Sequence, residues 1–169
     1  MTDPQFELLG LLADEFRAGG MPASVLPADA PAPAQLVMPI DSGRVGRHLR
    51  VSSYFLPGVD HPAVMQHFVS LPYLVVPSAV APLARYLALL NPELPVTGFE
   101  MNEHARVVVF RHTHAVTVHP LDPGVVAWTV SMVSAAVREF GDGVERVGAG
   151  ADVDEVFADA RVLLDSFAR

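Results

Sequence analysis

The sequence predicts an α+β protein, with an antiparallel sheet of about five strands and helices packed on it. Apolar residues recur at helical spacing near both ends of the chain and again after Pro77. Between these stretches lie short segments in which apolar and polar residues alternate or β-branched residues follow one another. Because strands are grouped between helices, we expect the order α-β-β-β-α-β-β-α, with one further helix at the end.

Length and composition indicate one globular domain. The chain has 169 residues, of which 51% are apolar and 18% charged. It has no cysteine, which excludes disulfides, thiolate metal sites and cysteine nucleophiles. No apolar run reaches the roughly 18 residues that span a bilayer, and the acidic N-terminus lacks the basic start of a signal peptide. We therefore expect a cytoplasmic protein that makes no membrane contact.

The chain divides into three segments by composition. Residues 1–20 are predicted to form an N-terminal amphipathic helix, because apolar residues at spacings of three and four give one stripe and two glycines follow it. Residues 21–34 are rich in proline and alanine and are predicted to be a linker, long enough for the helix to pack on its own domain or on another subunit. Residues 35–169 are the predicted α+β domain, with an extra C-terminal helix.

Three strands are expected in the first part of this domain. Turn-forming residues separate them at positions 41–46 and 57–62. In the second strand Leu49 and Val51 alternate with polar residues, and Pro72 is expected to end the third.

The next part is predicted to be a helix followed by a β-hairpin. Ser78 is the expected N-cap of the helix, and Asn91 followed by proline ends it. The letters NEHA form the turn of the hairpin, and a run of β-branched residues from Val107 to Val118 forms its long second strand.

Two more helices are predicted after the hairpin. An aspartate N-cap, Asp122, followed by proline starts a helix that extends to Phe140. The glycine-rich residues 141–150 are expected to connect it to a final helix, which begins with a capping box formed by Asp152 and Glu155.

The first of these two helices has an apolar surface that is wider than one sheet face needs. Val125, Trp128 and Met132 widen its main apolar stripe. We therefore expect burial on a second side, against another helix or a second subunit, and assign these three residues to a dimer or partner surface.

The distribution of charge does not favour direct nucleic-acid binding. The formal net charge is −8, whereas phosphate binding needs a cationic surface. Arg44, Arg47 and Arg50 gather in one segment as a candidate basic patch. They are interpreted as solvated surface or, as a weaker alternative, as part of an accessory factor to a DNA-binding or DNA-repair protein.

The sequence contains no recognised catalytic motif. It lacks GxxxxGK[ST], GxSxG and HExxH, and no pair of carboxylates can be assigned to acid–base chemistry. We therefore predict a protein that is not an enzyme and that uses no cofactor.

Histidines concentrate in the letters RHTHAVTVH at positions 111–119. On a strand His112 and His114 point to the same face. One alternative is a metal-binding protein or enzyme that uses this face, with Glu100 or His104 across the hairpin completing the ligand set. The other is an ordinary strand whose histidines lie at its wetter end, and this second alternative is favoured.

One stretch resembles a known family. A helix ending in Leu-Asn is followed by x-x-L-P-x-x-x-F-E, a short turn and R-V-x-x-x-R, as in the YbjN family of bacterial proteins. The matching residues are Leu90, Asn91, Leu94, Pro95, Gly98, Phe99, Glu100, Arg106, Val107 and Arg111. The long linker and the final helix after Gly150 are not part of this pattern.

The resemblance implies a fold similar to type III secretion chaperones. Such domains are usually homodimers that hold extended protein segments, and the family is described as stress-response regulators without a known active site. What it implies here is a non-enzymatic dimeric chaperone-like adaptor or regulator that binds another protein chain.

Overall fold

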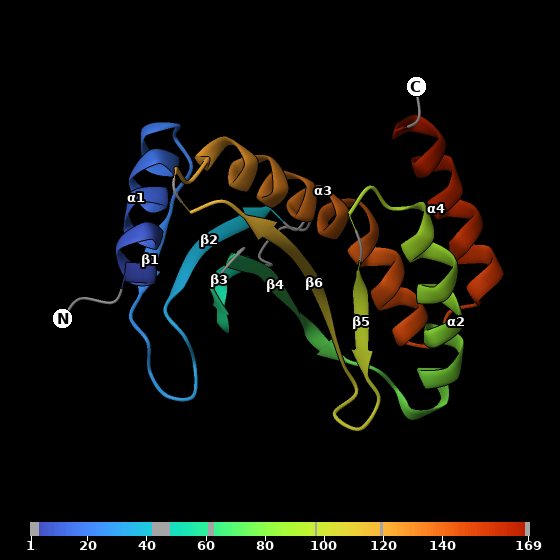
Figure 1. The fold of residues 1–169 in the computed structure, drawn as a ribbon. Helices are drawn as coiled ribbons and strands as arrows, with labels where there is room; N and C mark the ends of the chain where they lie inside the picture. Colours follow the sequence, from blue (N-terminus) through green and yellow to red (C-terminus); the bar gives the residue numbers. More distant parts are fainter. Residues whose placement is uncertain (1–3, 42–47, 61–62, 97, 119, 168–169) are drawn as a thin grey trace.

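The computed structural model describes residues 4–41, 48–60, 63–96, 98–118 and 120–167 (Figure 1). Within these ranges the chain forms one antiparallel sheet of six strands in the order β1-β2-β3-β4-β6-β5, accompanied by four α-helices. The α+β class is therefore confirmed, with one strand more than the number predicted.

The elements follow the predicted order apart from that extra strand. The strands are β1 (Ser24–Leu26), β2 (Gln35–Asp41), β3 (His48–Asp60), β4 (Ala63–Leu74), β5 (Phe99–Asn102) and β6 (Val107–Val116). The helices are α1 (Pro4–Ala18), α2 (Val80–Leu90), α3 (Pro123–Gly148) and α4 (Val153–Phe167), with 3-10 turns at Pro77–Ala79 and Asn91–Glu93.

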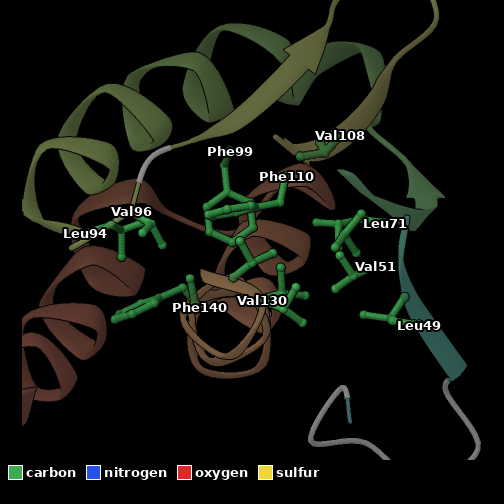
Figure 2. Close-up of a cluster of buried hydrophobic side chains, with 14 of the residues drawn as sticks. Leu49, Val51, Leu71, Leu94, Val96, Phe99, Val108, Phe110, Val130 and Phe140 are labelled. Carbon is green, nitrogen blue, oxygen red and sulfur yellow. The ribbon is translucent and has the colours of Figure 1, made fainter. Parts of the chain in front are cut away.

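The core lies between the sheet and α3. Figure 1 shows α3 crossing the sheet from α1 at one end to α2 and α4 at the other. Phe99 of β5 and Phe110 of β6 meet edge to face with ring centroids 4.9 Å apart. In Figure 2 Val130 of α3 lies next to this pair and Phe140 lies to one side, below Leu94 and Val96; all four side chains of α3, β5 and β6 are buried.

Helix α1 packs on its own domain. Its apolar stripe is buried at Leu9, Leu12 and Phe16, and the helix contacts β1, β2 and α3. The segment after it differs from the linker expected at residues 21–34, because β1 lies within it and pairs with β2. A strand of three residues is too short to show alternation, so only its backbone pairing reveals it.

Strand β3 continues through residues that were predicted to form a turn. The expected turn at 57–62 begins inside β3, where the register with β4 shifts between Phe55 and Asp60. Gly58 has a φ of +76°, which favours glycine. A β-bulge of this kind allows β3 to continue through Pro57 and Gly58, although such a pair usually forms a turn.

Strand β4 likewise runs past Pro72, which was predicted to end it. Its register with β6 shifts between Ser70 and Leu74. Proline cannot donate to the ladder, and irregularities of this kind are where sheets accommodate it.

The predicted N-cap of α2 is wrong, whereas those of α3 and α4 are confirmed. Ser78 lies in a 3-10 turn, and Ala79 precedes the helix without a side-chain cap. Asp122 accepts hydrogen bonds from the N–H groups of Gly124 at 2.8 Å and Val125 at 3.4 Å. Asp152 accepts two at 3.0 Å at the start of α4.

Helix α3 extends to Gly148, through the glycines that were predicted to form a connection. A Cβ atom on Gly143 would lie 2.6 Å from the hydroxyl oxygen of Tyr86, and one on Gly148 would lie 3.2 Å from Tyr73 Cε2. Glycine thus permits close approach of α3 to α2 and β4, and packing outweighs the low helix propensity of glycine.

We expect Gly143→Ala to destabilise the protein and Gly141→Ala to stabilise it. At Gly141 the nearest atom to a new Cβ, a methyl carbon of Val137, lies at 3.9 Å, an ordinary contact, so alanine should gain up to about 1 kcal/mol of helix propensity. At Gly143 the new methyl would lie 2.6 Å from the hydroxyl oxygen of Tyr86 and 3.2 Å from a methyl carbon of Val156, so one of them must move. Urea unfolding measures both free energies.

A double variant tests the cause. Tyr86→Phe removes the closest atom, so it should restore part of the stability lost in Gly143→Ala. Equal effects of the two alanine substitutions, or no rescue by Tyr86→Phe, would contradict this account of α3.

Candidate functional site

Three histidines meet on the inner face of the sheet, where sequence reasoning had identified two. His112 and His114 lie on β6, and His67 of β4 is the register partner of His112. The ring centroids of His67 and His114 are 5.1 Å apart, those of His112 and His114 5.8 Å, and those of His67 and His112 6.5 Å. The sequence missed His67 because only the pairing of β4 with β6 brings it to the others.

Two of the three histidines are within hydrogen-bond distance of a hydroxyl group. His67 is fully buried, at 0% exposure, and its Nδ1 lies 2.7 Å from the Ser53 hydroxyl. Nδ1 of His114 lies 3.3 Å from the hydroxyl of Thr129 on α3. Within the described residues, Nε2 of His67 and Nε2 of His114 are buried without a hydrogen-bond partner.

The histidines share their face with Phe110, as expected, but this face points towards α3. The half of β6 that contains the histidines is nevertheless more exposed than the half from Val107 to Phe110, as predicted. Arg111 and Thr113 of the opposite face are exposed there, whereas His112 and His114 are half-buried.

Burial favours the neutral form of two of these histidines, His67 and His114. It lowers the pKa of His67 to about 3, with further lowering from the nearby charges of His114 and His112. Burial and then His112 lower the pKa of His114. The buried polar side chains of the described residues are Ser52, Ser53, Gln66, His67 and Thr129, so no fully buried Asp or Glu among them offsets a proton on the cluster.

The structure does not assemble the ligand set considered for a metal. Glu100 lies on the outer face of the sheet, where it pairs with Arg111 at 2.9 Å, and His104 is exposed in the hairpin turn. Among the residues described, no group of three or more His, Asp or Glu is placed to hold a metal ion. His119 lies outside those residues.

The candidate basic patch is described at one position only. Arg44 and Arg47 lie outside the described residues, and Arg50 is exposed on β3 opposite Pro39 of β2.

The assigned dimer or partner surface lies at the N-terminal half of α3. Val125 is 48% exposed, Trp128 is 60% exposed and Met132 is half-buried. We call these three residues the α3 patch.

The residues of the family-like pattern hold the hairpin against α2. The side-chain amide of Asn91 donates to the carbonyl of Phe99 and accepts from its N–H, both at 2.9 Å. Phe99 lies on the edge strand β5, so Asn91 supplies the pairing that a further strand would give. Arg106 adopts a φ of 54° in the turn, and its carbonyl accepts from Val75 N–H at 2.9 Å. These contacts are structural.

A groove lies on the outer face of the sheet, opposite α3. Its volume is about 970 Å³. The described lining residues come from β1 to β4 and the chain before β2: Ser24, Leu26, Ala32, Pro33, Gln35, Val37, Pro39, His48, Leu49, Arg50, Ser52, Tyr54, Phe68, Ser70 and Pro72. The lining places small side chains beside larger ones: Ser52 is the register partner of Phe68, and Ser70 follows two positions after Phe68 on β4. Sequence reasoning missed this outer groove, because strand register assembles it.

Comparison of the chain with models of known protein families, with curated proteins and with solved structures finds no match. None of the helices in the described residues combines the length and the apolar character that crossing a membrane requires.

We expect the stability of the protein to fall with acid because of the histidine cluster. The folded pKa of His67, about 3, lies below the unfolded value of about 6.5. The stabilisation is therefore complete above that unfolded value and is lost as pH falls towards 3, by up to about 1.4 kcal/mol per pH unit for one histidine. Urea unfolding between pH 7 and 4 measures this slope.

The variant His67→Gln should flatten that dependence, since glutamine takes up no proton. His104→Gln, in the exposed hairpin turn, should keep the profile of the unaltered protein. Parallel profiles for His67→Gln and the unaltered protein would rule out His67 as the source.

Proposed function

We propose that the protein is a non-enzymatic, chaperone-like adaptor that acts as a homodimer and holds an extended segment of another protein. The observation that carries the proposal is the outer groove on the face of the sheet opposite α3. The resemblance to the YbjN family, with its type III secretion chaperone-like fold and its stress-response role, supports the same function.

The groove has the size and shape that this function needs. At about 970 Å³ it is at the upper end of the range typical for small-molecule sites. It lies open along the sheet face across four strands, and its apolar side chains alternate with hydroxyl groups. A segment of chain can lay side chains across such a surface, whereas a small molecule would be left with much of its surface in water.

Self-association would use the α3 patch. Exposed aromatic and apolar residues that lie together are typical of protein interfaces, and tryptophan is enriched among residues that dominate their energy. The patch lies on α3, away from the outer groove, so a dimer formed there would leave both grooves accessible.

Charge in the α3 patch is expected to dissociate the dimer. Val125→Asp would bury a carboxylate in an apolar contact, so light scattering should report the monomer mass for this variant and twice that mass for the unaltered protein. Val162→Asp is the matched control, since Val162 is 71% exposed on α4. Equal masses for Val125→Asp and the unaltered protein would remove the α3 patch as the dimer surface.

Filling the groove is expected to release the partner. Ser70 is exposed in the groove lining, so Ser70→Tyr should fold normally and occupy the space of a bound segment. Affinity purification from the native organism, followed by mass spectrometry, should recover a partner with the unaltered protein and with Ser78→Tyr, but lose it with Ser70→Tyr. Ser78 is also exposed but lies in the turn before α2. Retention of the partner by Ser70→Tyr would contradict the groove assignment.

A further inference from the structure

We propose that the outer groove selects a peptide segment that carries apolar side chains and a carboxylate, and that Arg50 pairs with that carboxylate. This inference rests on the proposed function and specifies the chemistry of the segment.

The charge of the groove is opposite to that of the chain. The sequence has 19 acidic residues against 11 arginines, with no lysine. Yet the described lining residues include Arg50 and His48 and no Asp or Glu. On the same face Glu100 is paired with Arg111, and Asp41 lies at the end of β2 opposite His48. An anionic group is therefore attracted to the groove and repelled by much of the remaining surface.

Arg50 is available for a ligand. It forms no ion pair or hydrogen bond with any residue that the structure describes, whereas five other described arginines are ion-paired: Arg17, Arg85, Arg111, Arg138 and Arg146. A guanidinium presents a planar fork of donors that matches the two oxygens of a carboxylate.

The rest of the lining specifies apolar side chains. Leu26, Val37 and Phe68 project from three different strands of the outer face, with Ser52 between Val37 and Phe68 in the strand register. An extended peptide directs alternate side chains to one face, so an apolar residue can lie against these walls while a residue two positions away reaches Arg50. This arrangement favours a protein segment over a nucleic acid, which would need several cations.

Selection from a random peptide display library tests the inference with the full chain as bait. The baits are the unaltered protein, Arg50→Gln, Arg50→Lys, Ser70→Tyr and Arg161→Gln. Arg161 is an exposed arginine of α4 and serves as the matched control. We expect the unaltered protein and Arg161→Gln to enrich apolar peptides that contain Asp or Glu, Arg50→Gln to enrich apolar peptides without that bias, and Ser70→Tyr to enrich none.

Fluorescence anisotropy then measures one enriched peptide and its Glu→Gln or Asp→Asn version. The acidic peptide should bind the unaltered protein about tenfold more tightly than the amide version. The difference in affinity between the two peptides should vanish with Arg50→Gln. It should be partly kept with Arg50→Lys, because lysine retains the positive charge but lacks the planar guanidinium group.

The outcomes separate this inference from the proposed function. If peptides bind without a preference for acidic residues and Ser70→Tyr abolishes binding, the inference that Arg50 pairs with a carboxylate fails. The proposal that the groove binds a protein segment is then kept. If no peptide is enriched, or if Ser70→Tyr binds as the unaltered protein does, both proposals fail. If Ser70→Tyr instead converts a dimer to a monomer in light scattering, the groove is an interface between copies of this chain and the inference is overturned.

Discussion

The packing of α3 against one face of the sheet is the constraint on which the rest of the structure depends. Val130, Val133 and Phe140 of α3 are buried in one core cluster with the side chains that the strands direct inwards. Because side chains alternate along a strand, this contact decides the environment of every residue in the sheet. It places the histidines inside and Arg50, Ser70 and Tyr54 outside, so the two faces acquire different chemistry from the same strands.

Close approach at the other end of α3 fixes the helical layer. Gly143 and Gly148 allow α3 to lie against Tyr86 of α2 and Tyr73 of β4, and α4 then packs on both α2 and α3. Asn91, at the end of α2, pairs with the edge strand β5. Part of the family-like pattern therefore marks a corner where a helix end and a sheet edge are joined.

Sequence reasoning succeeded where a signal is local and failed where a signal needs register. Helical stripes and the face shared by His112 and Phe110 follow from periodicity within one element, and the Asp122 cap follows from an aspartate that directly precedes proline. The strand β1, the addition of His67 to the cluster and the outer groove depend on which strand lies beside which, and no single segment carries that information. The extension of α3 to Gly148 was missed for a related reason. In the sequence, glycines predict a connection, and only the structure shows that Gly143 lies against Tyr86, where a larger residue would not fit.

Strand β4 contributes side chains to both the histidine cluster and the outer groove. This strand directs His67 into the interior and Phe68 and Ser70 towards the outer groove, so the buried imidazole and the groove wall belong to adjacent positions of one backbone. Protonation of His67 favours the unfolded chain, whereas any segment that binds only the folded groove favours the folded one. Proton uptake and segment binding then oppose each other by thermodynamic linkage, without a direct contact between the two sites. If a segment binds the outer groove as proposed, the alternation that separates the two faces would also link the stability of the inner face to binding at the outer one.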